Sequence, residues 1–146
     1  MRDSLLVQTF RTLTKQERRD LRKWLNSPFF NLRADVTRLF DYLCEVVPVG
    51  VSELPEAVLN KKSAFTQVFP QEDGRRSGGY KDADMRHAMS FLYQGVKAYL
   101  AYAHWRQDEV DAGRHLCKSL RERGLELVFE KEFEALSAQL SSAPHQ

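Results

Sequence analysis

Apolar side chains recur along this chain at the three- and four-residue spacing of an α-helix, and no alternating stretch is long enough to predict a strand. A first helical stripe is followed by the S/T-x-x-E capping box Thr14-Lys15-Gln16-Glu17. In such a box the hydroxyl and the carboxylate each accept a bond from the other residue's backbone amide, which predicts a second helix at about 15–25. The first stripe holds Leu5, Leu6, Thr9, Phe10 and Leu13, and the second helix would bury Leu21, Trp24 and Leu25.

The hexapeptide NSPFFN at residues 26–31 separates the second helix from a third. Ser27 precedes a proline and is therefore disfavoured in the helical region, so the second helix should end near Asn26. Asn31 is a favourable N-cap for the third helix. That helix is expected to run to about Val47, and its predicted inner face holds Leu32, Val36, Leu39, Phe40 and Leu43.

Two adjacent phenylalanines in this turn admit two interpretations, a structural wedge between helices or an exposed docking point. Burying one ring contributes about 1.5–3 kcal/mol, a large part of the stability of a small domain. We therefore expect both rings in the core, beside Trp24 and Val36. The predicted structural motif consists of Pro28, Phe29, Phe30 and Asn31.

The middle of the chain contains two short predicted helices, a loop and one long helix. The short helices are LPEAVLN, and KSAFTQVF after Asn60 or Lys61. Residues 71–79 have three glycines and no apolar side chain, which predicts a flexible surface loop and the only obvious internal boundary. Residues 81–107 form the long helix, whose wide apolar arc predicts a central position. Its two stripes hold Met85, Met89, Leu92, Val96, Leu100 and Ala103, and Ala88, Phe91, Tyr99 and Tyr102.

The last part of the chain has the pattern of a helical hairpin. Its arms are expected at about 107–122 and 125–141, and Gly124 is well placed as the glycine that follows the first arm. These elements predict an all-α fold of six to eight helices, a compact bundle around a long central helix with a C-terminal hairpin. We expect one helical domain over residues 1–142, divided into an N-terminal bundle (1–70), the flexible loop (71–79) and the long helix plus hairpin (80–142), and a disordered tail at 143–146.

Composition and cysteine usage are those of a globular protein in a reducing compartment. The 146 residues are 42% hydrophobic and 29% charged, which suffices for one domain with a core. Cys44 and Cys117 lie far apart without CxxC spacing, which favours reduced core thiols over a disulfide. The N-terminal apolar run is too short for a signal peptide, and no apolar stretch approaches about 18 residues. We expect a cytoplasmic protein without a membrane partner.

The net charge of +2 is unevenly distributed along the chain. Residues 1–33 carry eight basic and three acidic side chains, whereas residues 34–60 carry one basic and five acidic ones. The basic side chains of the first two helices follow helical spacing, which predicts a basic face opposite Leu21 and Trp24. A solvated face is the leading interpretation, ahead of an acidic protein partner and of nucleic acid. This candidate partner-binding face consists of Arg11, Lys15, Arg18, Arg19, Arg22 and Lys23.

No residue pattern in the sequence predicts a chemical reaction. The four histidines are scattered, and His115 and Cys117 would point about 200° apart on a helix, so we expect no metal site. The sequence lacks the glycine-rich and nucleophile motifs of phosphate-binding folds and hydrolases. Acidic clusters alternate with basic and polar positions, as on solvated helix faces. We therefore expect no catalytic residue and no cofactor, in a protein that is not an enzyme.

Several segments are distinctive in order and spacing: LTKQERRDLRKWLNSPFFN with LFDYL after it, AFTQVFP at 64–70, DMRHAMSFL at 84–92 and LRERGL at 120–125. Together they resemble the N-terminal region of a family of uncharacterised bacterial proteins, mostly from Bacteroidetes, that share an SPFFN or SPYFN turn. Members of this family often continue into a tetratricopeptide-like helical array. The resemblance covers nearly the whole chain and implies no assigned activity.

The helical pattern and the lack of a catalytic set predict a non-catalytic scaffold or adaptor domain that mediates protein–protein interaction. The alternative is a nucleic-acid-associated regulator that uses the basic face from Arg11 to Lys23. A six-helix signalling module over residues 1–105 is disfavoured by the long helix. If the chain is one end of a helical array, its last hairpin needs a neighbour or a cap, and a homodimer through Phe129 and Phe133 is then a further option.

Overall fold

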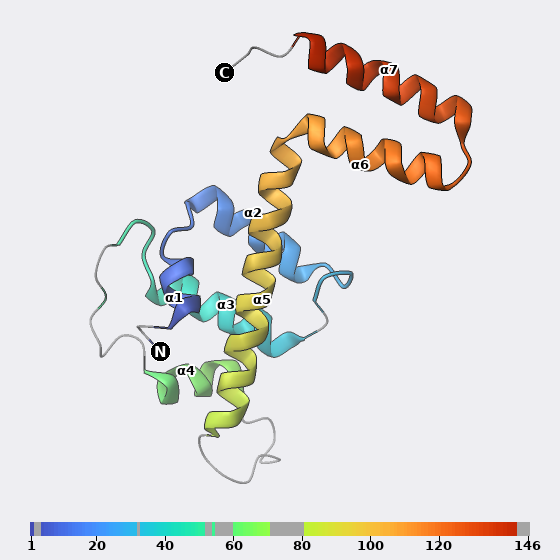
Figure 1. Cartoon of the computed structure of the whole chain (residues 1–146). Coiled ribbons are helices and arrows are strands. Elements are labelled where there is room, and N and C mark those ends of the chain that lie inside the picture. Colours follow the sequence, from blue (N-terminus) through green and yellow to red (C-terminus); the bar gives the residue numbers. More distant parts are fainter. Residues whose placement is uncertain (2–3, 32, 52–53, 55–59, 71–80, 143–146) are drawn as a thin grey trace. The chain divides into compact units, whose positions relative to one another are not determined.

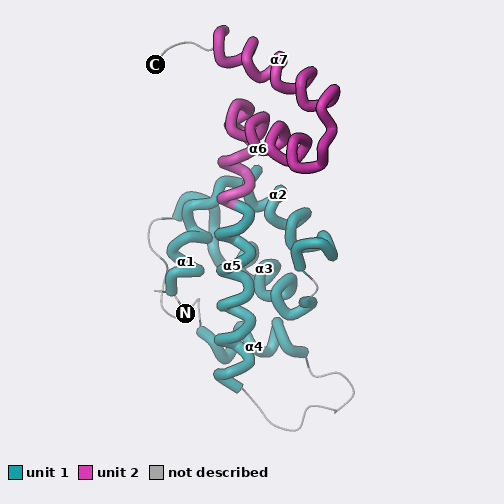
Figure 2. The backbone as a smooth tube through the Cα atoms, turned by 45° about the vertical axis from the view of Figure 1, so that its right-hand side comes forward, with its two compact units in different colours: residues 1–99 teal, residues 100–146 magenta. Residues whose placement is uncertain are grey.

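The structure is a computed structural model that describes residues 1, 4–31, 33–51, 54, 60–70 and 81–142. These residues form seven α-helices and no strand, which confirms the all-α class and the predicted helix number (Figure 1). The chain divides into two compact units, residues 1–99 and 100–146 (Figure 2), and each is described by itself. Most of the predicted helix LPEAVLN, the loop at 71–79 and the tail at 143–146 lie outside the described residues.

The second helix of unit 1 begins and ends close to the predicted positions, whereas the first ends before its predicted apolar stripe does. α1 (Leu5–Phe10) carries that stripe except for Leu13, and α2 (Lys15–Asn26) follows it. The capping box at the start of α2 is complete, because the Glu17 amide donates to the Thr14 hydroxyl at 3.1 Å and the Thr14 amide donates to the Glu17 carboxylate at 2.9 Å. Local sequence alone therefore accounts for this helix.

The third and fourth helices match the prediction apart from one helix start. α3 (Ala34–Val46) ends close to the predicted position, and α4 (Lys61–Val68) begins after Asn60, whose side chain accepts a backbone amide bond at 2.8 Å. The prediction that Asn31 caps α3 is wrong, because Arg33 occupies the N-cap position and makes no side-chain cap bond. The Asn31 side chain bonds to other groups, which shape the turn described below.

The core of unit 1 lies where α1 to α4 pack around the first part of α5 (Asp82–Gln107) (Figures 1 and 2). Phe10 and Phe40 meet there edge to face, with ring centroids 5.9 Å apart. The long predicted helix is thus confirmed, although Phe91 on its second apolar stripe is 45% exposed. The buried side chains of α5 are Met85, Ala88, Leu92, Val96 and Tyr99.

Unit 2 contains the end of α5 and a hairpin of α6 (Glu109–Glu122) and α7 (Glu126–Ser142). Gly124 follows α6 with a φ of 74°, a left-handed conformation that glycine adopts without strain, as predicted. A Cβ atom at Gly113 would lie 2.9 Å from the Leu136 side chain, so this glycine allows the two helices to approach closely. The predicted hairpin is confirmed.

Candidate functional site

The sequence predicted that Arg18 faces solvent, and this prediction is wrong. Its side chain lies inside unit 1, and the residue is 7% exposed. Its Nη1 atom donates to the Val47 carbonyl oxygen at 2.5 Å, and its guanidinium carbon lies 4.3 Å from the centre of the Phe10 ring. Burial lowers the pKa of Arg18 from its ordinary value. The helical spacing that grouped Arg18 with its neighbours could not reveal that α1 and α3 cover this position.

The other members of the predicted basic face differ in how freely their charges are available. Arg11 donates from Nε and Nη2 to the Val51 carbonyl oxygen, each at 3.4 Å. Arg22 forms an ion pair with Asp41, and its guanidinium carbon lies 5.0 Å from the centre of the Phe40 ring. Three exposed cations without an ion pair to another described residue remain along α2, namely Lys15, Arg19 and Lys23.

The NSPFFN turn forms an exposed aromatic rim. Phe29 and Phe30, both predicted to be core residues, are 88% and 48% exposed, so that prediction is wrong. Phe30 does lie beside Trp24 as expected, with ring centroids 3.6 Å apart and ring planes at 11°. Phe29 in turn meets Phe30 edge to face at 5.0 Å. The rings stack outward from α2 one on another, and such a stack covers only part of each ring.

A cleft of 320 Å³ lies beside this rim, between the turn, α3 and α5. Gly95 of α5 keeps the helices close, since a Cβ atom there would lie 3.2 Å from the Leu25 side chain. Among the described residues that line it, the polar side chains besides the Trp24 indole are Asn31 and Gln94, and none is charged. Its apolar lining comes from Trp24, Leu25, Phe30, Val36, Phe91 and Ala98, and we call this site, with Phe29 at its rim, the aromatic cleft.

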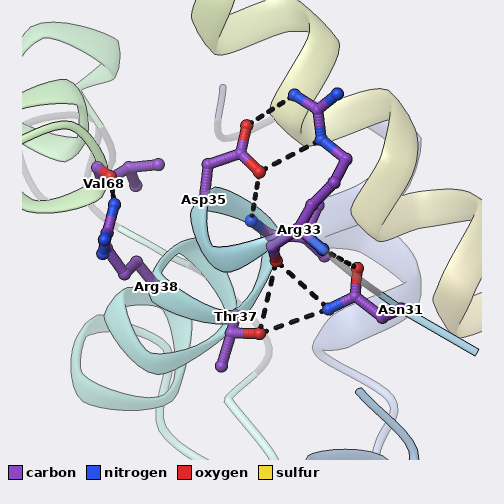
Figure 3. A network of polar contacts seen from close by, with 7 residues as sticks. Asn31, Arg33, Asp35, Thr37, Arg38 and Val68 are labelled. Carbon is purple, nitrogen blue, oxygen red and sulfur yellow. Dashed lines mark hydrogen bonds and ion pairs between the residues drawn. The ribbon is translucent and has the colours of Figure 1, made fainter. Parts of the chain in front are cut away.

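Asn31 fixes the turn by joining the end of α2 to the start of α3, and Figure 3 shows its bonds to Arg33 and Thr37. Its Nδ2 atom donates to the Leu25 carbonyl at 2.9 Å, to the Arg33 carbonyl at 3.2 Å and to the Thr37 hydroxyl at 3.2 Å. Its Oδ1 atom accepts a bond from the Arg33 amide at 3.0 Å. A single side-chain amide therefore positions the aromatic rim next to the cleft.

Arg33 borders the aromatic cleft without giving it a free charge. Its guanidinium carbon lies 4.3 Å from the centre of the Phe91 ring. Two bonds connect the same guanidinium to Asp35, from Nη2 at 2.6 Å and from Nε at 3.1 Å (Figure 3). The bond to Asp35 raises the pKa of Arg33. The edge of the cleft is thus an ion pair with compensated charge, so the site favours apolar ligands.

The described residues contain no group of three or more His, Cys, Asp or Glu side chains placed to hold a metal ion. Cys44 is half-buried, and burial raises the pKa of its thiol, which keeps it protonated at neutral pH. The aromatic cleft has no titratable side chain in its described lining. The aromatic cleft can therefore bind a ligand by apolar packing and ring stacking, and Gln94 can add a hydrogen bond.

Phe91 and Gln94 were not among the predicted site residues. Phe91 lies on the same predicted apolar stripe of α5 as the buried Ala88, three residues before it, so helical spacing alone does not distinguish the exposed ring from the buried residue. One side of α5 is left uncovered because of where the NSPFFN turn lies relative to α5. The spacing of apolar residues within α5 does not predict the position of that turn. The motif NSPFFN was the signal that pointed to this region.

The fold and the site define an all-α protein of seven described helices with an apolar cleft. None of its described helices combines the length and the apolar character that crossing a membrane requires. No family model, curated protein or solved structure matches this chain. The resemblance to the SPFFN family therefore stays a prediction.

Proposed function

We propose that this protein is a non-catalytic helical adaptor that acts in the cytoplasm and binds another protein through the aromatic cleft. The observation that carries this proposal is the exposure of Phe29, Phe30 and Phe91, at 88%, 48% and 45%, around an uncharged cleft. Contiguous exposed apolar groups on a globular protein mark interaction sites, and aromatic side chains are enriched at the centres of interfaces. The absence of any catalytic motif from the sequence supports the non-catalytic part.

The ligand that fits this cleft is an apolar segment of the partner protein. A volume of 320 Å³ is at the small end of the range for ligand pockets, about 300–1,000 Å³, and accommodates one or two large side chains. The exposed Gln94 amide can bond to the partner's backbone, and the Arg33–Asp35 pair adds no net charge. We therefore expect binding that changes little with salt, because screening weakens charge pairs and not apolar packing.

Affinity capture from the native host with the full chain tests the proposal. The cleft variant combines Phe29→Ser with Phe91→Ser, and the matched control combines Arg19→Ser with Lys23→Ser, which changes exposed residues on α2. We expect wild type and control to retain the same stoichiometric protein, and the cleft variant to lose it while its melting temperature stays close to that of wild type. Equal recovery of that protein on the cleft variant would overturn the proposal.

A binding measurement with defined peptides tests the same site directly. The chain has two tryptophans, so Trp105→Phe leaves Trp24 in the cleft as the only indole reporter. We expect apolar peptides selected by display on this variant to shift the Trp24 emission at saturable concentrations. The same peptides should leave the emission of Phe91→Ser/Trp105→Phe unchanged. An equal shift in both variants would place the peptides outside the cleft.

The second candidate function is nucleic-acid binding, which the exposed Lys15, Arg19 and Lys23 on α2 favour. Binding through phosphates would weaken steeply with salt, with a slope of about −0.7 to −0.9 for each phosphate contact. Titration of duplex and single-stranded DNA and RNA at low and high salt decides this alternative. We expect no saturable binding at low salt, because only three of the six predicted cations are free of other described contacts.

A further inference from the structure

The hairpin of unit 2 carries a second apolar surface, which the adaptor proposal does not use. Phe133 and Leu140 of α7 are 51% and 46% exposed, and Phe129 stacks on Phe133 with ring centroids 5.6 Å apart. In a helical projection of about 100° per residue these side chains share one side of α7, next to Leu136, which packs on Gly113 of α6. We call this surface, with Val110 and Cys117 at the corresponding positions of α6, the hairpin face.

The other side of the hairpin is distinguished by a polar contact between its helices. The Gln139 side chain donates to the Glu109 carboxylate at 3.3 Å. In projection Gln139 lies about 100° from Leu140, and Glu109 lies about 80° from Cys117, both turned away from the hairpin face. Phe133 and Leu140 therefore lie on one side of the hairpin and the polar contact between its helices on the other, the side to which the exposed Leu116 and Val128 also project.

Charges of opposite sign border the two edges of the hairpin face. In projection, Lys118 and Arg121 lie beyond Cys117, toward the side of α6 away from α7. Glu126 and Glu130 lie beyond Phe133, toward the side of α7 away from α6. All four charged side chains are exposed, and none forms an ion pair with another described residue. Helix dipoles favour Arg121 and Glu126 at their helix ends, but they do not account for the exposed rings between the two edges.

We propose that the hairpin face binds the same face of a second copy, in a dimer whose two-fold axis runs parallel to the hairpin helices. This axis places α6 of one copy antiparallel over α7 of the other. Lys118 and Arg121 of each copy then lie over Glu126 and Glu130 of the other, and the rings of Phe133 are covered between them. A two-fold axis across the helices would instead place α6 over α6 and α7 over α7, so that Lys118 and Arg121 would not meet Glu126 and Glu130.

The arrangement of apolar and charged side chains on the hairpin face indicates a second copy of the chain as its partner. One apolar stripe between a basic edge and an acidic edge is self-complementary under a two-fold rotation, so every cation gains an anion without a different partner. The inference does not depend on the aromatic cleft, because its residues lie on α6 and α7 alone. Four antiparallel helices with apolar side chains between them are a stable arrangement.

Sedimentation of the 146-residue chain tests this dimer with two charge-reversed variants. The acidic variant carries Lys118→Glu and Arg121→Glu, and the basic variant carries Glu126→Lys and Glu130→Lys. We expect wild type to sediment as a dimer at low salt and each variant alone as a monomer, because both of its edges then have the same sign. An equimolar mixture of the two variants should form a heterodimer, since every edge again meets its opposite.

The controls separate the hairpin face from a general effect of charge or folding. Lys131→Glu makes the same charge change as Arg121→Glu, but on the side of α7 away from the hairpin face, and it should leave the dimer intact. Phe133→Ser should give a monomer with unchanged helix content by circular dichroism. A wild-type chain that stays monomeric at every concentration overturns the proposal. So does an acidic variant that dimerises like wild type, or a mixture that stays monomeric.

Discussion

Arg18 has the most costly position of any charged residue described in unit 1. Moving a guanidinium out of water is unfavourable unless several hydrogen bonds or a counter-charge replace its hydration. Arg18 has one carbonyl partner and the face of the Phe10 ring, while its buried Nε and Nη2 atoms have no hydrogen-bond partner among the described residues. The packing of its aliphatic stem and of the guanidinium plane on Phe10 is then the main favourable contribution of this residue.

Two substitutions separate packing from charge at this position. Arg18→Ala leaves a cavity beside Phe10 and should lower the free energy of unfolding by about 2–4 kcal/mol. Arg18→Met fills most of the space without a desolvated charge and should stay within about 1 kcal/mol of wild type. Urea denaturation checks both, and Arg19→Ala at an exposed position is the matched control. If methionine is as harmful as alanine, the bond to Val47 contributes more than the packing does.

Three acidic groups of unit 1, two of them buried and one half-buried, predict a loss of stability at alkaline pH. Burial raises the pKa of Cys44, Tyr42 and Tyr99 above the ordinary values of 9.0 for a thiol and 10.0 for a phenol. As the pH rises, these groups therefore lose their protons at a lower pH in the unfolded chain than in the folded protein. Their contribution to stability is complete below the unfolded pKa and disappears as the pH rises through the folded pKa. We expect the melting temperature to fall above about pH 9, and to fall less steeply in Cys44→Ala/Tyr42→Phe.

At the scale of elements, the turn between α2 and α3 combines a rigid support with an exposed end. The amides of Phe30 and Asn31 both donate to the Ser27 carbonyl, at 3.1 and 3.0 Å, which closes the turn after α2. Asn31 then ties the turn to α3, and the stack of Phe30 on Trp24 extends the support to its outer side. The aromatic cleft is thus held in shape before any ligand binds, which lowers the entropic cost of binding.

Asn31→Asp tests this support with almost no change in side-chain size. The carboxylate can still accept the bond from the Arg33 amide, but it cannot donate to Leu25, Arg33 or Thr37. We expect a loss of about 1–3 kcal/mol in the free energy of unfolding, because the part-buried bonds to the Leu25 carbonyl and the Thr37 hydroxyl lose their donor. Thermal melting measures the loss, and near-ultraviolet circular dichroism should report a weaker Trp24–Phe30 stack. An unchanged spectrum together with wild-type stability would show that the backbone bonds to Ser27 suffice.

At the scale of the whole molecule, the sequence predicted where the helices lie but not which of their side chains are buried. The capping box at Thr14 and Glu17 and the glycine at position 124 act locally, so their effect could be predicted from neighbouring residues. Whether Arg18 is covered and Phe29 uncovered depends on segments tens of residues away, which helical spacing does not report. The same limit explains why the aromatic cleft needed the structure, since it unites the NSPFFN turn with α5.

The two compact units differ in how much apolar core they bury, and this difference predicts stepwise unfolding. Unit 1 contains most of the fully buried side chains, whereas Cys117 and Leu136 are the buried apolar residues described in α6 and α7. Local stability follows buried contacts, so unit 2 should open at a lower denaturant concentration. Trp24 lies in unit 1 and Trp105 in unit 2. The variants Trp105→Phe and Trp24→Phe therefore each report one unit by fluorescence.

We expect the Trp105 transition to occur at a lower urea concentration than the Trp24 transition. Dimerisation through the hairpin face adds a further condition, because a partner that binds the folded state stabilises it by mass action. The Trp105 midpoint should then rise with protein concentration, while the Trp24 midpoint stays constant. In the acidic variant Lys118→Glu/Arg121→Glu the concentration dependence should disappear and the order of the two transitions should persist. Coincident transitions in both tryptophan variants would mean that the two units unfold as one cooperative structure.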